Sequence, residues 1–335
     1  MKILKNRGMH LISKKIHIII DPTTISSAND ADLVLISHAH IDHIKNVEKI
    51  NPLKILSRPT FDLLSSNLKK NCKITNFKII EPYNSPKDEI NIQGCKISAF
   101  HAGHCLGSFQ FRIKLNNKII LYTGDFCLES RFGMNKAPLL KCNNGIFITD
   151  DTYFSQEYVF PTRKTLYPKI LSWFKETLEK NEEIIIIAQR LGVQQEITAL
   201  LNYSTLNCSL FTHPSIYKAN EIHSSYLPLG KFQYKRHPLE KKRQNKTLTS
   251  YFNSKNRNGN NKKYNSKSVI LLPYYYVRKI RELEEKYNRN SIMIATGWAK
   301  TQNFRVKSFP LSSHAGYDQI LDYQKYSRAQ KTFFF

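Results

Sequence analysis

The sequence has few acidic residues for its length. Its 335 residues include 26 Asp and Glu against 51 Lys and Arg, so the formal net charge at pH 7 is +25. This imbalance points to a polyanionic partner, with nucleic acid as the first candidate and an anionic membrane surface as the second. A biased genome rich in Lys and Asn explains part of the excess. The charge would nevertheless bind phosphates in a salt-sensitive way.

Long apolar runs and paired cysteines are also missing. The longest apolar run, residues 184–188, is far too short to cross a bilayer, and charges interrupt the apolar residues at the N-terminus, which argues against a secretory signal. The six cysteines form no CxxC pair and no cluster. They fit a reduced, intracellular compartment: cytoplasm or nucleoid in a prokaryote, nucleus in a eukaryote. With 41% hydrophobic residues, the chain can bury one large core or two medium ones.

Histidine is concentrated in one stretch, SHAHIDH, at residues 37–43. It follows the apolar run DLVLI and carries four potential metal ligands, His38, His40, Asp42 and His43. A β-branched run that ends in such a cluster predicts a buried strand that delivers ligands to a loop. On an extended backbone the first two histidines point to the same side, while the next two ligands can face a second position. This donor set suits zinc, and its density suits two ions; the alternative is a solvated polar loop.

HAHIDH resembles the HxHxDH signature of metallo-β-lactamase-fold hydrolases, which include lactamases, glyoxalases, lactonases, redox proteins and nucleases. Two later segments, AGHCLGS and TGDF, resemble the third and fourth metal-binding motifs of this superfamily. The resemblance implies that His104 is a metal ligand and that Asp125 bridges two cations. Asp21, at the end of the strand expected over 15–24, either orients a ligating histidine or is a surface turn residue.

Residues 145–163, GIFITDDTYFSQEYVFPTR, resemble motif A of the β-CASP nucleases. The match is closest to the DNA-directed members, the Artemis-type cross-link repair nucleases and the prokaryotic ligase-associated exonucleases. It makes Asp150 the acid that supports the reaction centre, and it leaves Arg163 either to hold a phosphate or to cap a helix. Residues 307–326 resemble motif B, so His314 is the candidate general acid, with a neighbour of a helix cap as the alternative.

The resemblance implies an α/β protein with an αββα metallo-β-lactamase sandwich and an inserted β-CASP-like α/β cap. The expected boundaries are 1–155 for the sandwich, 156–300 for the cap and 301–335 for the return, with KTFFF as the start of the last core strand. The chain is expected to end before motif C, which would weaken the second metal site. The implied catalytic residues are Asp42, Asp125, Asp150 and His314. One zinc ion would be held by His38, His40 and His104, a second would be held or shared by Asp42, His43 and Asp125, and Mn²⁺ could substitute.

Contacts to nucleic acid are expected from the cap. A strand–Gly–helix junction near residue 190 offers a positive helix end, with Arg190 and Gln195 as phosphate contacts. The segment 231–268 is rich in Lys, Arg and Asn and is expected to be largely disordered. Within it, Lys241, Lys242 and Arg243 are candidate DNA contacts. Its NKTLTSYF resembles the sliding-clamp (PCNA) binding box, with Asn245, Leu248, Tyr251 and Phe252 at the contact positions; incidental packing is the alternative.

The predicted activity is metal-dependent hydrolysis of phosphodiester bonds. A DNA nuclease of repair or replication, an exonuclease in preference, is the leading hypothesis, because residues 145–163 match the DNA-directed branch. An RNA-processing nuclease of the same superfamily shares almost every catalytic motif and is the first alternative. A non-catalytic nucleic-acid-binding or scaffold protein is the second.

Overall fold

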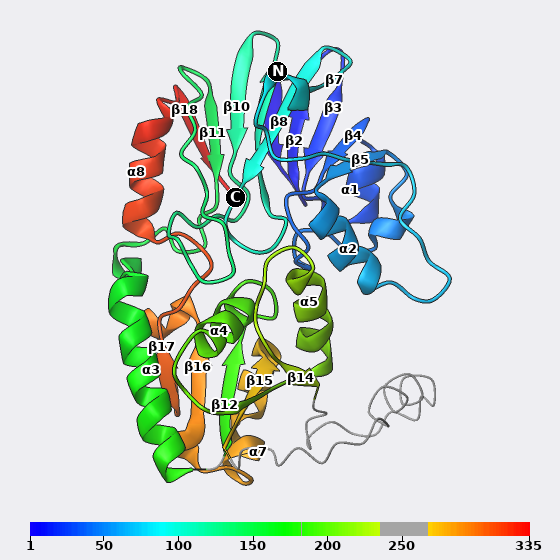
Figure 1. Cartoon of the computed structure of the whole chain (residues 1–335). Coiled ribbons are helices and arrows are strands. Elements are labelled where there is room, and N and C mark those ends of the chain that lie inside the picture. The colour runs from blue at the N-terminus through cyan, green and yellow to red at the C-terminus, as the bar shows by residue number, and fades with distance from the viewer. Residues whose placement is uncertain (182, 235–266) are drawn as a thin grey trace.

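The first 149 residues build two β-sheets that face each other, and the last residues of the chain return to the second of them (Figure 1). The structure is a computed structural model that describes residues 1–181, 183–234 and 267–335. The first sheet has the order β1-β2-β3-β4-β5-β6. Its strands are β1 (Lys2–Lys5), β2 (Met9–Ile12), β3 (His17–Ile20), β4 (Leu33–Leu35), β5 (Leu53–Leu56) and β6 (Phe77–Ile79).

The second sheet has the order β18-β11-β10-β9-β8-β7. Its strands are β18 (Lys331–Phe334), β11 (Ile146–Thr149), β10 (Lys118–Tyr122), β9 (Phe109–Leu115), β8 (Cys95–His101) and β7 (Ile90–Ile92). The C-terminal strand β18 pairs in parallel with β11, with Phe147 opposite Thr332. KTFFF therefore forms an edge strand of the sandwich, as its apolar run predicts.

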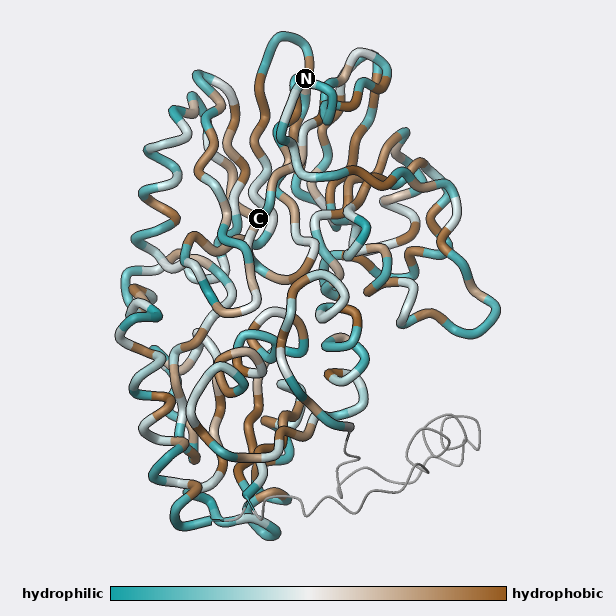
Figure 2. The backbone as a smooth tube through the Cα atoms, in the orientation of Figure 1, coloured by the Kyte–Doolittle hydropathy of each residue, from teal (hydrophilic) through white to brown (hydrophobic). Residues whose placement is uncertain are grey.

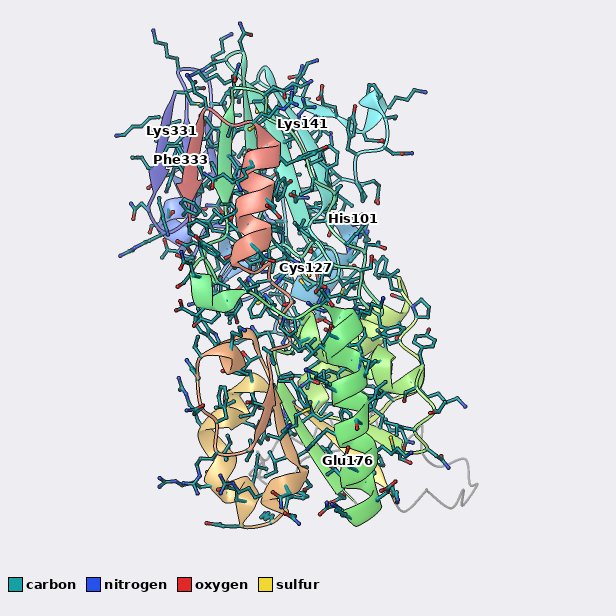
Figure 3. All side chains as sticks on the ribbon, turned by 90° about the vertical axis from the view of Figure 1, so that its left-hand side faces the viewer. His101, Cys127, Lys141, Glu176, Lys331 and Phe333 are labelled. Atoms are coloured by element: carbon teal, nitrogen blue, oxygen red, sulfur yellow. The ribbon has the colours of Figure 1, made fainter. Side chains whose placement is uncertain are left out.

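Alternating apolar residues from both sheets meet in one core between them, which includes Leu11, Ile18, Ile97 and Ile113. Helices α1 (Ile25–Asn29) and α2 (Arg58–Ser66) cover the outer face of the first sheet, and α8 (Tyr317–Ser327) covers that of the second. Figure 3 shows α8 lying over its sheet, above the start of the long helix of the inserted unit. This αββα arrangement confirms the predicted fold class.

The inserted unit is a third sheet of six parallel strands with helices on both faces. Its order is β14-β13-β15-β12-β16-β17. The strands are β12 (Glu183–Ala188), β13 (Ser209–Thr212), β14 (Gln233–Tyr234), β15 (Ser268–Pro273), β16 (Ile292–Ala295) and β17 (Lys307–Phe309). Helices α3 (Arg163–Lys180), α4 (Val193–Asn202) and α5 (Pro214–Ser224) pack on one face, and α7 (Ile280–Glu284) packs on the other.

Hydropathy explains this arrangement. Parallel strands with helices on both faces are buried on both sides, so they read as continuous apolar runs such as the IIII of β12. Figure 2 shows these strands as hydrophobic segments inside the unit, while more hydrophilic residues lie at the outer ends of the elements. The carboxyl ends of β12 and β16 point toward the sandwich, which is where ligand sites form in open parallel sheets.

Two predicted boundaries differ from the structure. β17 pairs with β16, with Met293 opposite Lys307, so residues 307–309 still belong to the third sheet and the return to the sandwich comes later than 301. The segment expected to be disordered from residue 231 onward contains β14, which pairs with β13. Its polar composition conceals an edge strand that needs few apolar residues; residues 235–266 lie outside the described part of the chain.

Among the described residues, no helix is both long enough and apolar enough to cross a membrane.

Candidate metal centre

The SHAHIDH stretch begins where β4 ends. Ile36 N donates to Ile55 O (2.9 Å), which extends the buried strand by one residue. The chain then turns at His40, whose carbonyl accepts from His43 N and Ile44 N (3.2 Å each). The strand thus delivers His38 and His40 to the interior, and the turn separates them from His43.

Hydrogen bonds fix the tautomers of two histidines in this centre. Ser37 Oγ donates to Asp21 Oδ2 (2.5 Å), so it accepts from His38 Nδ1 (2.9 Å). His104 Nδ1 likewise donates to Ser313 O (3.1 Å). A neutral imidazole carries hydrogen on only one nitrogen. The Nε2 atoms of both rings therefore present lone pairs.

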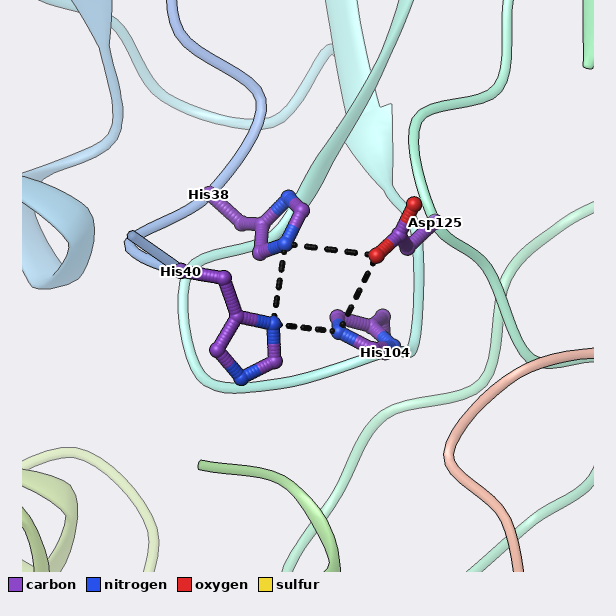
Figure 4. Close-up of side chains that lie close together, drawn as sticks. All are labelled: His38, His40, His104 and Asp125. Carbon is purple, nitrogen blue, oxygen red and sulfur yellow. Dashed lines mark hydrogen bonds and ion pairs between the residues drawn. The ribbon is translucent and has the colours of Figure 1, made fainter. Parts of the chain in front are cut away.

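These lone pairs converge with two further acceptors (Figure 4). His40 Nδ1 lies 3.0 Å from His38 Nε2 and 2.9 Å from His104 Nε2. Asp125 Oδ2 lies 3.4 and 3.5 Å from the same two Nε2 atoms. His40 Nδ1 can donate a hydrogen to either His38 Nε2 or His104 Nε2, but not to both. The Nε2 atom of His40 is buried without a hydrogen-bond partner. A cation would satisfy this arrangement, and three imidazoles with one carboxylate are a donor set that fits Zn²⁺.

Burial keeps these imidazoles neutral. It lowers the pKa of His38 and His104 well below the usual range, and the charge of neighbouring histidines adds to the effect. Burial is also the main reason that the pKa of His40 falls to about 3. Neutral imidazole is the form that binds a metal, so these histidines can act as ligands without first losing a proton.

Asp21 is a buried carboxylate beside these histidines, and it accepts several hydrogen bonds. Its Oδ1 accepts from Ser37 N (2.7 Å), and its Oδ2 accepts from Ser37 Oγ, from Tyr122 Oη (2.8 Å) and from His43 Nδ1 (3.1 Å). A carboxylate with this many donors orients its neighbours, which favours the orienting role of Asp21 over a surface turn. Sequence reasoning missed Ser37 and Tyr122, although each stands within three residues of a predicted ligand.

His43 and Asp42 do not form a matched pair. His43 Nε2 lies 3.4 Å from Asp125 Oδ1, so Asp125 faces the three-histidine group with one oxygen and His43 with the other. Asp42 is exposed and belongs to none of the potential metal-binding groups among the described residues. It instead lines a pocket of about 280 Å³ on the His43 side. The predicted role of Asp42 as a ligand therefore stays a prediction: the residue is exposed, and it lines the same pocket as His43 and Asp125.

Asp150 and His314 form a pair on the other side of Asp125. Asp150 Oδ2 accepts from His314 Nδ1 (2.7 Å), and its Oδ1 accepts from Thr152 N (2.8 Å) and Oγ1 (2.6 Å). His314 Nε2 lies 3.8 Å from Asp125 Oδ2. Burial lowers the pKa of His314, but the charges of Asp150 and Asp125 outweigh it and raise this pKa to about 8. Burial raises the pKa of Asp150, but His314 and Thr152 bring it below its usual value.

Two predicted phosphate contacts are sealed inside the protein. The Arg163 guanidinium is buried and donates through Nε to Glu196 Oε1 (3.0 Å). Gln195 accepts from Gly192 N (2.7 Å) and donates to Asn220 Oδ1 (2.8 Å). The N-terminus of α4 is thus closed by its own side chain rather than left open for a phosphate. The predictions for Arg163 and Gln195 are corrected to structural roles.

Arg190 remains the predicted contact nearest the metal centre. Its side chain is half-buried, its positive charge helps to lower the pKa of His40, and burial lowers its own pKa. The other predicted contacts to nucleic acid, Lys241, Lys242 and Arg243, lie outside the described residues. So does the predicted clamp-binding box, Asn245, Leu248, Tyr251 and Phe252.

Sequence reasoning missed a buried ion-pair cluster beside the centre, here called the joint, which consists of Glu129, Arg131, Arg163 and Glu196. Glu196 on α4 accepts from Arg131 of the sandwich (2.8 Å) and from Arg163 at the start of α3. Arg163 also pairs with Glu129 of the sandwich (2.6 Å). The joint therefore ties the inserted unit to the sandwich next to the metal ligands.

Fold and site together describe a metallo-β-lactamase sandwich with a β-CASP-like insertion and a polar centre between the two. No protein-family model matches the chain. An RNase J-like protein of Methanocaldococcus jannaschii is 28% identical over 217 residues, which are 58% of this chain and 50% of that protein. Endoribonuclease YSH1 of Candida glabrata is 26% identical over 51% of this chain and 25% of its own length. Cleavage and polyadenylation specificity factor subunit 3 of Dictyostelium discoideum is 25% identical over 59% of this chain and 28% of its own length.

These relatives indicate the metallo-β-lactamase β-CASP family. The chain spans between a quarter and a half of the length of each of these three relatives.

The comparisons also correct the predicted substrate. The leading hypothesis of a DNA nuclease in repair is wrong, because these relatives are named as ribonucleases and as a polyadenylation factor. The likeness of residues 145–163 to DNA-directed enzymes misled because catalytic motifs act on the phosphate, which RNA and DNA share. The proposed binding to a DNA sliding clamp has no support from these relatives either.

Proposed function

We propose that this protein is a metal-dependent phosphodiesterase that hydrolyses RNA. The observation that carries the proposal is the convergence of acceptor atoms from His38, His40, His104 and Asp125 in a buried cluster that a divalent cation would satisfy. The ribonuclease names of the relatives support RNA as the substrate, and the high positive charge supports a polyanion.

His38, His40, His104 and Asp125 would hold the metal, with His43 on the second oxygen of Asp125. A divalent ion such as Zn²⁺ bound there supplies a Lewis acid for the phosphate and lowers the pKa of a water. Asp21 keeps His43 in its orientation through Nδ1. The charge of Arg190 acts on His40, so this guanidinium would stabilise the negative charge that develops on the phosphate in the transition state.

His314 is placed to protonate the leaving oxygen. Asp150 holds the Nδ1 hydrogen, which leaves Nε2 facing Asp125 and the metal centre. With a pKa of about 8, this imidazole carries a proton at neutral pH. During hydrolysis the water oxygen forms a bond to phosphorus and loses a proton to the solvent, while the bond to the leaving oxygen breaks and that oxygen takes the proton from Nε2. Solvent then returns a proton to His314.

The test is a cleavage assay on RNA and DNA oligonucleotides of the same sequence, end-labelled, with Zn²⁺ or Mn²⁺ and with EDTA. We expect the metal-loaded chain to cut RNA in preference and EDTA to stop the reaction. His40→Ala should remove cleavage, whereas His17→Ala should not. His17 pairs with His10 at the opposite end of β3 from Asp21, which makes it a matched control.

Three outcomes would count against the proposal. Preferred cleavage of DNA would contradict the substrate, and full activity of His40→Ala would contradict the site. Binding of RNA without cleavage under any metal condition would favour the non-catalytic alternative.

A further inference from the structure

The pocket on the His43 side of the centre has cations at its edge and carboxylates among its other lining residues. Lys5 at the end of β1 and Arg7 in the following turn line it, together with Asp125 and Asp150. Both basic side chains are exposed. Its volume of about 280 Å³ is small for a ligand site and suits a phosphate with its sugar rather than a folded RNA.

Three of the four aspartates that line this pocket are already engaged by other groups, whereas Asp42 is exposed. Asp125 faces His43, and Asp150 accepts from His314 and Thr152. Asp21 accepts from four donors, as described above.

Neither Lys5 nor Arg7 forms an ion pair within the described part of the chain. Lys5 is close enough to Asp151 to act on its pKa, but burial still raises that pKa. Two cations next to a metal-binding centre repel a bound cation unless an anion lies between them. They are therefore placed for an anionic ligand from outside.

The turn that carries Arg7 is held rigidly. Thr23 N and Ser27 Oγ both donate to Arg7 O (2.9 and 3.3 Å). Gly8 has a φ of +136°, and a Cβ there would lie 3.1 Å from Ile20 O, so the tight approach of this turn to β3 requires glycine. Because the backbone is fixed, the point from which the Arg7 side chain extends is set before any ligand arrives.

Cations thus stand on two sides of Asp125. Arg190 comes from the inserted unit and acts on His40, whereas Lys5 and Arg7 come from the first sheet and lie beside His43. We propose that Lys5 and Arg7 form a phosphate-binding subsite for single-stranded RNA, which holds the backbone phosphate next to the scissile one on the side away from Arg190. This inference rests on the proposed function and adds the path of the strand across the centre.

The first test measures equilibrium binding of single-stranded RNA to the cleavage-deficient His40→Ala chain over a series of salt concentrations. The variant Lys5→Ala/Arg7→Ala is compared with Lys2→Ala/Lys14→Ala, which removes two exposed charges from the same sheet region outside the pocket. We expect the pocket variant to bind roughly tenfold more weakly and to lower the slope of log K against log salt by about 0.7, the contribution of one single-strand phosphate contact. Equal effects of the two variants would overturn the subsite.

The second test locates the phosphate. A series of RNA substrates carries one uncharged methylphosphonate at successive positions around the cut. The penalty of Arg7→Ala on KM should disappear only for the substrate that lacks the charge adjacent to the scissile phosphate, with kcat little changed. A penalty that is the same for every position would contradict a defined subsite.

The two proposals fail in distinguishable ways. If the wild-type chain cleaves RNA but the pocket variant matches its control, the subsite is wrong and the proposed function stands. If the wild-type chain cleaves nothing, the salt-dependent binding still tests the subsite.

Discussion

Two buried polar clusters meet at His104, and they differ in whether the chain itself satisfies them. In the joint, Glu196 faces Arg131 and Arg163 with both oxygens, and each of these arginines also donates to a backbone carbonyl. Arg131 reaches the carbonyl of His104 itself (3.0 Å). In the metal centre the imidazole of the same residue points into a group of acceptors that no donor completes.

The difference separates a structural cluster from a binding site. Buried ions persist when they are paired, as in the joint, where every charge has an opposite partner and only Arg131 Nε lacks a hydrogen bond. A buried group of lone pairs without enough hydrogens costs free energy until a cation arrives. The joint holds the backbone of the loops that carry His104 and Ser312, so its ion pairs keep the incomplete cluster in place.

Substitution of Asp125 should give the largest difference between the effect on RNA cleavage and the effect on stability. Asp125→Asn removes the carboxylate that faces both His38 and His43, so we expect RNA cleavage to fall by roughly a thousandfold or more. The free energy of unfolding of the metal-free protein should change little, because the loss of the ion pairs with His43 and His314 is offset by the relief of a cluster of acceptors. Cleavage assays and urea unfolding in EDTA measure the two effects. A large loss of metal-free stability would show that the centre is satisfied without a metal.

A substitution in the joint should instead lower the free energy of unfolding. Glu196→Gln keeps the shape but leaves Arg131 without a charge partner and Arg163 with Glu129 alone, which we expect to cost about 3–5 kcal/mol of the free energy of unfolding. Glu284 offers a matched control, because it pairs with Arg289 and Arg305, which are mostly exposed. Glu284→Gln should cost less than about 1 kcal/mol. Equal costs in urea unfolding would contradict the role of the joint.

The grouping of the candidate ligands His38 and His40 was predictable because its signal is local. His38 and His40 share one side of an extended strand by the period of two, and a buried strand precedes them in the sequence. The position of Asp42 was not predictable, because a turn at His40 decides which way the next side chain points. Arg163 and Gln195 were misread for a related reason: a basic or amide side chain next to a helix start suits a phosphate and a buried partner equally well.

The ion pairs of the joint could not be predicted from a pattern in the sequence. Arg131 and Glu196 lie 65 positions apart, and Glu196 stands on a helix whose polar residues look like an ordinary exposed face. Only the insertion of one α/β unit into the sandwich brings these charges together. The choice between RNA and DNA was also beyond the catalytic motifs, since the groups that act on phosphorus are the same for both.

Zinc should complete the metal centre and stabilise the fold. A ligand that binds only the folded state at a hundredfold excess over its Kd adds about 2.7 kcal/mol to the free energy of unfolding. We expect Zn²⁺ to approach this value, and Mg²⁺ to do less because it prefers oxygen ligands. His104→Ala should remove the zinc effect in the same urea experiment. Stabilisation that persists in this variant would place the zinc elsewhere, for example on the free thiols.

Lys54 is a buried lysine for which the described part of the chain offers no anion. There its ammonium group donates to two carbonyl oxygens, Ile50 O (2.6 Å) and Pro52 O (2.9 Å), and burial lowers its pKa to about 8. The pKa in the unfolded chain is higher, so the unfolded state binds more protons between the two values and stability should rise as pH increases above about 8. We expect Lys54→Met to gain about 1–2 kcal/mol at pH 7 and to lack this rise. Urea unfolding at pH 7 and pH 9.5 checks both, and a wild-type stability that falls over this interval relative to the variant would show that the two carbonyls favour the charged form.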